Sequence, residues 1–98
     1  MFDIIIEFLG TFIFILSILI SHKYPEYAIP VITGLVLIAV MFIGVVTSGG
    51  HFNPAVSTAM LLNGTISLEK FVIYIIAQMF GAIAAILFYN YGIKNRKH

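Results

Sequence analysis

Long apolar runs alternate with short polar interruptions along this chain, and three of the runs are long enough to cross a membrane. They extend over about residues 4–20, 28–46 and 68–93. A helix that crosses a hydrocarbon core of about 30 Å needs roughly 20 residues, within a range of about 17 to 25. The pattern therefore predicts three transmembrane helices.

A fourth apolar segment, residues 54–62, is too short to cross, because nine residues extend only about 13 Å as a helix. It follows a polar, glycine-containing loop, TSGGHF, at residues 47–52. Unsatisfied backbone groups cost several kcal/mol each in lipid, so a loop can turn inside a membrane only where protein surrounds it. We predict a re-entrant half-helix over residues 54–62.

Asn53 and Pro54 open this half-helix. Proline suits the first helical position, and asparagine suits the N-cap, where its side-chain oxygen accepts a backbone N–H from the first turn. The amide NH₂ then stays free to donate beside the positive end of the helix dipole, where it would orient water and repel cations. The Asn53-Pro54-Ala55 tripeptide, taken alone, is more typical of a cap on a surface helix.

Composition excludes an ordinary soluble domain. Of the 98 residues, 61% are hydrophobic and 9% are charged, whereas a small globule buries only about 60% of the surface of its unfolded chain. We therefore expect an integral, multi-pass membrane protein surrounded by lipid, with the cell membrane as its location. The first run has no basic residue before it and no small-residue cleavage site after it, so we expect a retained span rather than a signal peptide.

The basic residues favour one orientation. If the three spans alternate in direction, Lys70 shares a side with the N-terminus and the half-helix loop, and Lys23, Lys94, Arg96 and Lys97 lie on the other side. The positive-inside rule then places the C-terminus in the cytoplasm and the loop outside. The net charge of +1 argues against nucleic acid as a partner.

No residue pattern typical of an enzyme is present in the sequence. There is no cysteine, and the acidic residues and histidines are scattered. The chain therefore has no acid–base pair, nucleophile constellation, phosphate loop or metal-ligand cluster. We expect no enzymatic activity, no bound metal and no cofactor.

Four ordered motifs resemble the aquaporin and aquaglyceroporin family, the major intrinsic proteins. The segment SGGHFNPAV at residues 48–56 is similar to the family's Ser-Gly-x-His-x-Asn-Pro-Ala-Val loop. EFLGTF at 7–12 resembles its first helix, YIIAQMFGAIAA at 74–85 its third, and the Thr33-Gly34-Leu35 stretch falls at the right distance before the loop. The resemblance implies an all-α membrane fold in which residues 1–98 are one half of the inverted repeat, closest to the N-terminal half.

The resemblance also implies a pore. Six residues of the loop and of the half-helix would line it, through side chains or backbone carbonyls: Gly49, Gly50, His51, Asn53, Pro54 and Ala55. Glu7 in the first span and Gln78 in the third would support the loop by hydrogen bonds. A carboxylate at the membrane interface and an ordinary interhelical hydrogen bond are the alternatives for these two.

Alignment with the family suggests a selectivity constriction made of Thr33 together with Met41, Gly50 and Val56 of a partner unit. An orthodox water channel of the family has an aromatic residue, a histidine and an arginine in this constriction. The residues present here predict an opening without a fixed cation, more apolar and wider.

One half with one loop should not enclose a pore alone. We therefore expect a passive channel for water, and for small uncharged solutes such as glycerol, urea or ammonia, formed by an inverted antiparallel dimer, with four such dimers assembling as a tetramer of pores. Two alternatives remain open: pairing with a separately encoded second half, or a non-conducting structural or regulatory membrane subunit.

Overall fold

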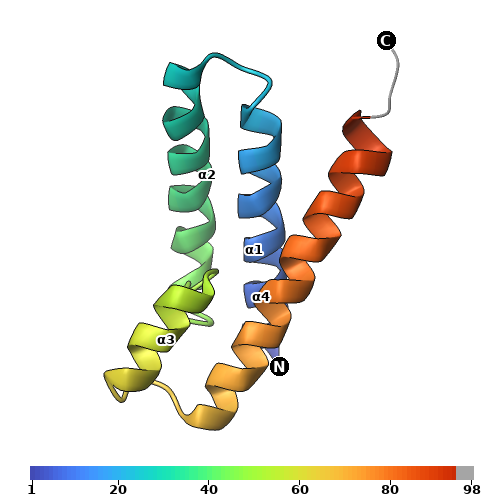
Figure 1. The fold of residues 1–98 in the computed structure, drawn as a ribbon. Coiled ribbons are helices and arrows are strands. Elements are labelled where there is room, and N and C mark those ends of the chain that lie inside the picture. The colour runs from blue at the N-terminus through green and yellow to red at the C-terminus, as the bar shows by residue number, and fades with distance from the viewer. Residues whose placement is uncertain (95–98) are drawn as a thin grey trace.

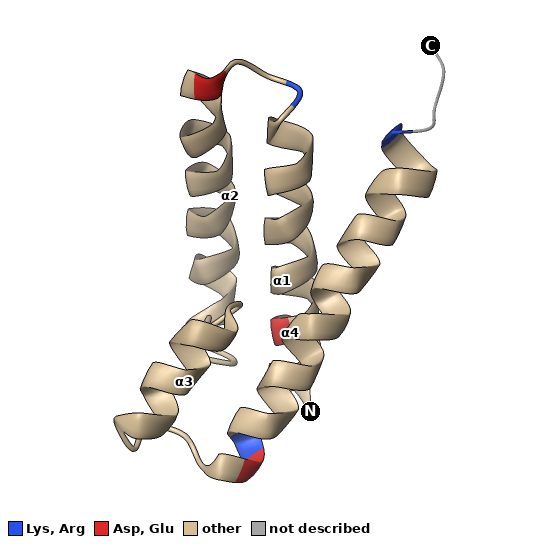
Figure 2. Ribbon diagram, viewed as in Figure 1, with Lys and Arg blue, Asp and Glu red and all other residues tan. Residues whose placement is uncertain are grey.

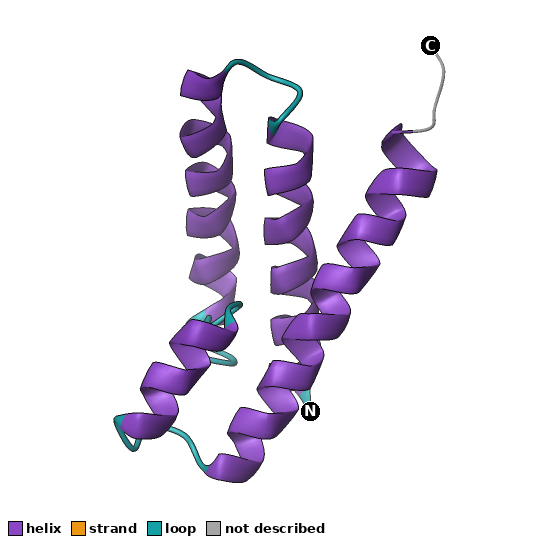
Figure 3. Ribbon diagram, viewed as in Figure 1, coloured by secondary structure: helices purple, strands orange, loops and turns teal. Residues whose placement is uncertain are grey.

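The computed structural model describes residues 1–94 as a bundle of helices, without a strand in that range (Figures 1 and 3). Arg96, Lys97 and His98 lie outside the described residues. Two of the four basic residues that predict the orientation of the chain are among them. The α-helices, in chain order, are α1 (Phe2–Ser21), α2 (Ile29–Gly44), α3 (Pro54–Leu62) and α4 (Leu68–Phe88). A 3₁₀ turn (Glu26–Ala28) precedes α2, and a π-helical segment (Tyr89–Lys94) follows α4.

Three helical segments are long and apolar enough to cross a membrane, namely Phe2–Ser21, Glu26–Gly44 and Leu68–Lys94. The nine-residue α3 is not one of them. The predicted all-α architecture with three potential spans is therefore confirmed for the described residues. The second α-helix ends two residues earlier than the predicted limit of 46, because the N–H groups of residues 47–49 converge on the Gly44 carbonyl.

The central helix is α1, which packs against α4 on one side and α2 on the other, while α3 packs against α4. Figure 1 shows the N-terminus, α3 and the start of α4 at one end of the bundle, and the α1–α2 connection at the other. Figure 2 shows that the charged residues gather mainly at these two ends. A chain with this arrangement places its polar ends in the two membrane interfaces and its apolar helices between them.

Gly81 allows α4 to approach α1 closely. A Cβ atom at this position would lie 2.6 Å from the Phe8 carbonyl oxygen and 3.1 Å from Cβ of Thr11. Small residues at such crossings let membrane helices bring their backbones together. The crossing lies one turn beyond Gln78 on α4, so it brings that side chain within reach of α1.

The second span is the least covered of the three. Within the apolar window of α2, 11% of the residues are buried, against 28% in each of the other two spans. One stripe of its surface consists of exposed apolar side chains: Val31, Leu35, Ile38 and Phe42. In a membrane this stripe is covered either by lipid or by another protein unit.

Candidate functional site

The site is built around the buried carboxylate of Glu7 in the second turn of α1. Its Oε2 accepts hydrogen bonds from Ser48 Oγ at 2.6 Å and from the backbone N–H of His51 at 3.0 Å. Its Oε1 accepts from the N–H of Phe52 at 2.8 Å and from Gln78 Nε2 at 2.9 Å. These four donors compensate a charge that would be very costly in hydrocarbon if it had no partner.

Gln78 and Ser57 connect this carboxylate to α3. Gln78 Nε2 also lies 2.9 Å from Ser57 Oγ, which in turn lies 2.8 Å from His51 Nδ1. Both Gln78 and Ser57 are buried. Hydrogen bonds between polar side chains thus connect α3 to α4 and, through Gln78, to α1.

The breaker loop, residues 45–53, separates its hydrogen-bond donors from its acceptors. The N–H groups of residues 47–49 donate to the Gly44 carbonyl, that of Gly50 to Ser48 Oγ, and those of residues 51 and 52 to Glu7. In contrast, the carbonyls of residues 49–52 accept no hydrogen bond from any atom of residues 1–94. Three of these unused acceptors, at residues 49–51, belong to the predicted pore lining.

The Phe52 side chain packs the loop against α1 and α2. It has a left-handed backbone (φ 54°), a conformation that costs a residue with a side chain on the order of 1–3 kcal/mol. Its buried ring lies between two glycines, since a Cβ atom would come within 2.1 Å of the ring at Gly10 and within 2.4 Å at Gly44. Burial of the ring offsets the backbone strain, and both glycines are needed for the ring to fit.

Asn53 caps α3 in the way that the Asn-Pro pair predicts. Its Oδ1 accepts the N–H of Ala55 at 2.8 Å, and Pro54 occupies the first helical position. The side chain is exposed, and its Nδ2 donates to no atom in residues 1–94. A free donor thus lies at the positive end of α3, next in sequence to the free carbonyls.

The predicted constriction residues are distributed over α2, the breaker loop and α3. Thr33 donates its hydroxyl to the Ile29 carbonyl of its own helix at 2.9 Å, and Met41 is exposed on the same helix. Val56 is half-buried in α3, and Gly50 is buried beside the end of α2. Since Thr33 precedes the end of α2 by about 16 Å of helix and Gly50 lies beside that end, the described residues do not bring these four positions together.

Sequence reasoning did not single out Ser48 and Ser57, which complete the network. A signal for Ser57 is present in the chain: it stands four residues after Asn53 in a short apolar helix, where a polar side chain must face protein rather than lipid. The involvement of Ser48 depends on the conformation of the loop, which residue spacing does not specify.

The sequence is similar to proteins of one known family. Residues 1–97 match the model of the family described as Major intrinsic protein. The chain is 43% identical over 82 residues to glycerol uptake facilitator protein-like 6 of Lactiplantibacillus plantarum, which covers 81% of this chain and 38% of that protein. It is 42% identical over 85 residues to aquaporin-5 of Sus scrofa, with 80% and 32% covered.

A third relative is aquaporin Z of Brucella melitensis, 34% identical over 88 residues, with 81% of this chain and 39% of that protein covered. The chain therefore spans well under half the length of these relatives.

Proposed function

Since the chain belongs to the major intrinsic protein family, we propose that it forms a passive channel for water and small uncharged solutes. One observation carries the proposal: three carbonyls without a partner, at residues 49–51, lie close in sequence to the Asn53 Nδ2, which also has no partner and lies at the positive end of α3. A neutral molecule that both donates and accepts hydrogen bonds can exchange its water contacts for these groups, whereas a cation meets a positive helix end.

In this proposal Pro54 and Ala55 begin the helix that presents Asn53, and Glu7 and Gln78 are the supports of the loop. The hydrogen bonds of Glu7 to the two backbone N–H groups favour this role, because they hold the loop with its carbonyls unused. The family is one of channels rather than enzymes, and transport would be passive.

For the solute, we propose water together with glycerol, urea or ammonia. The relatives include proteins named as aquaporins and one named as a glycerol uptake facilitator. Thr33, Met41, Gly50 and Val56 would form a constriction without a fixed cation, which favours a wider and more apolar opening than that of a strict water channel.

For the assembly, we propose that a second copy, inverted about an axis in the membrane plane, completes the pore, and that four such dimers form a tetramer. Two features of residues 1–94 support a second unit: they contain one short capped helix, α3, and the apolar stripe of α2 is poorly covered. Inverted repeats of this kind place their sites near the midplane, where the two Asn53 side chains would meet. A separately encoded second half could supply the same surfaces.

The channel proposal is tested by osmotic shock of vesicles that contain the purified chain. Wild-type vesicles are expected to shrink faster than bare lipid vesicles. Asn53→Asp keeps a good N-cap but adds a negative charge, and is expected to lower water permeability at least about tenfold, equivalent to ~1.4 kcal/mol. If wild type and variant both shrink at the bare-lipid rate, the chain is a non-conducting subunit and the proposal is wrong.

The constriction is tested separately by Val56→Arg in the same vesicles. We expect glycerol permeability to fall by roughly tenfold or more and water permeability by less than about threefold, because a bulky cation narrows an opening that water still passes. Val72→Arg, at an exposed position on α4, is the control for the added charge. Equal losses for both solutes would remove Val56 from the constriction.

The assembly is tested by reporters fused to the C-terminus in cells. An inverted homodimer needs both orientations, so we expect reporter signal from both faces of the membrane. Signal from one face only would contradict the homodimer and favour a separate second half, which the excess of basic residues on one side also favours.

A further inference from the structure

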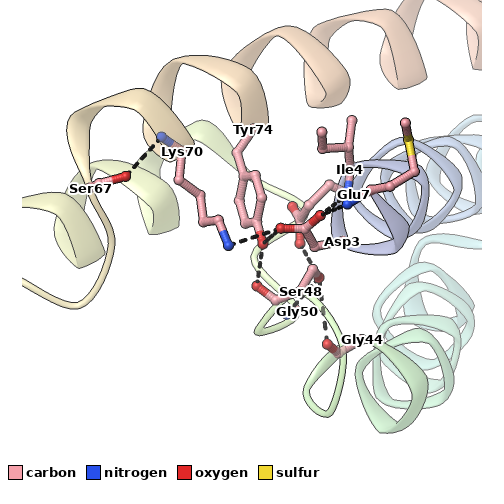
Figure 4. Close-up of polar contacts among 10 residues, drawn as sticks. Asp3, Ile4, Glu7, Gly44, Ser48, Gly50, Ser67, Lys70 and Tyr74 are labelled. Atoms are coloured by element: carbon pink, nitrogen blue, oxygen red, sulfur yellow. Dashed lines mark hydrogen bonds and ion pairs between the residues drawn. The ribbon is translucent and has the colours of Figure 1, made fainter.

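A second polar cluster connects the start of α1, the breaker loop and the start of α4 (Figure 4). The Tyr74 hydroxyl lies 2.8 Å from the Ser48 carbonyl oxygen and 3.3 Å from Asp3 Oδ2. Lys70 Nζ forms an ion pair with the same Asp3 Oδ2 at 3.0 Å. Contacts thus connect an exposed lysine in the first turn of α4 to a backbone carbonyl of the loop.

Tyr74 can satisfy only one of its two acceptors at a time, because a phenol has a single O–H proton. Its ring is buried and packs edge-to-face on His51, with 5.2 Å between ring centroids, so the hydroxyl has little freedom to move. Lys70 Nζ lies 3.0 Å from the same Asp3 Oδ2, and its positive charge weakens that oxygen as an acceptor for the phenol. The Tyr74 proton is therefore donated to the Ser48 carbonyl, which is also the nearer acceptor at 2.8 Å against 3.3 Å.

Ser48 is the residue at which this contact has the most effect. Its hydroxyl donates to Glu7 and accepts the N–H of Gly50, while its carbonyl accepts from Tyr74. The peptide plane that follows it is held from both sides, because the N–H of Gly49 donates to the Gly44 carbonyl. This plane immediately precedes the three free carbonyls, so we expect its orientation to affect theirs.

We propose that Asp3, Lys70 and Tyr74 form a surface latch that positions the breaker loop. Lys70 forms an ion pair with Asp3 and weakens the carboxylate as an acceptor for Tyr74. Tyr74 then donates its proton to the Ser48 carbonyl, and this hydrogen bond holds the loop in position. The effect of this latch on permeation rests on the proposed channel function, but the hydrogen bond itself can be measured without transport.

The hydrogen bond is measured by solid-state NMR of the full chain in lipid vesicles. Ser48-Gly49 is the only serine followed by glycine in the sequence, so carbonyl-¹³C serine combined with ¹⁵N glycine isolates one carbonyl signal. An accepted hydrogen bond moves such a signal downfield. We expect an upfield shift in Tyr74→Phe, and also in Lys70→Met although Lys70 does not touch Ser48. Lys70→Arg is expected to retain the wild-type position.

The same variants are then compared in the vesicle shrinkage assay. Tyr74→Phe and Lys70→Met are each expected to lower water permeability roughly two- to tenfold, as expected for the loss of one hydrogen bond. Their combination is expected to lower it no further than Tyr74→Phe alone, because the lysine acts through the tyrosine. Lys23→Met, which removes a lysine at the opposite end of the bundle, is the control and should match wild type.

The outcomes separate the latch from the channel. An unchanged carbonyl signal in Lys70→Met, or additive losses in the double variant, would overturn the latch. If the signal shifts as expected while wild-type vesicles shrink no faster than bare lipid, the latch stands and the proposed channel function fails.

Discussion

Replacing Glu7 with glutamine is expected to cause the largest loss of function of any single isosteric change in the chain. The amide would turn an NH₂ group toward a backbone N–H that now donates to a carboxylate oxygen, whichever way it is oriented. Each buried donor left without an acceptor costs roughly 1–3 kcal/mol. We expect the free energy of unfolding in detergent to fall by at least about 3 kcal/mol, and water permeability to approach the bare-lipid rate.

Unfolding is followed by circular dichroism during a denaturant titration, and permeability by vesicle shrinkage. Glu69→Gln makes the same chemical change at an exposed position in the first turn of α4 and should alter neither measurement appreciably. Wild-type stability in Glu7→Gln would show that the loop does not depend on the carboxylate. Loss of permeability without loss of stability would limit its role to the direction of the loop.

The second large effect is expected at Gly10, which needs only one added methyl group. In Gly10→Ala the new Cβ would lie 2.1 Å from the Phe52 ring, and the ring cannot retreat because Gly44 holds its other side. Overpacking in a filled interior costs typically about 1–3 kcal/mol, and here it also displaces the residue next to Asn53. We expect thermal unfolding at lower temperature and at least about tenfold lower water permeability.

Gly34→Ala is the matched control, because a Cβ at this helical position would meet no atom within 4 Å. It should be neutral or stabilising by up to about 1 kcal/mol. The double variant Gly10→Ala/Phe52→Leu, in which a smaller side chain leaves room for the methyl group, should recover part of the lost permeability. Absence of any recovery would mean that Gly10 matters for a reason other than the Phe52 ring.

The apolar pattern predicted the architecture well, because hydrocarbon permits few solutions. Three runs of sufficient length had to become helices, and the nine residues after Asn53 could only be a short capped helix. Glu7 and Gln78 could be expected to meet protein for a related reason, since a polar side chain inside a span needs a partner. These inferences depend on length and polarity rather than on detailed geometry.

Contacts that depend on the exact conformation of the loop could not be predicted in this way. The insertion of Phe52 between Gly10 and Gly44 combines a left-handed backbone with two helix crossings. Asp3 and Lys70 are separated by most of the chain, and periodicity gives no sign that they meet. Such contacts depend on three-dimensional packing, and they cannot be predicted from residue spacing.

The hydrogen bond between Glu7 and Gln78 joins two residues that are synthesised at different times. The two residues are 71 positions apart, so at typical synthesis rates of about 5–20 residues per second the carboxylate is made roughly 4–14 s before its amide partner. During that interval neither the loop N–H groups nor α4 are fully available to it. Until α4 arrives, Glu7 can find partners only in the breaker loop, and its set of four donors is complete only when Gln78 has been made.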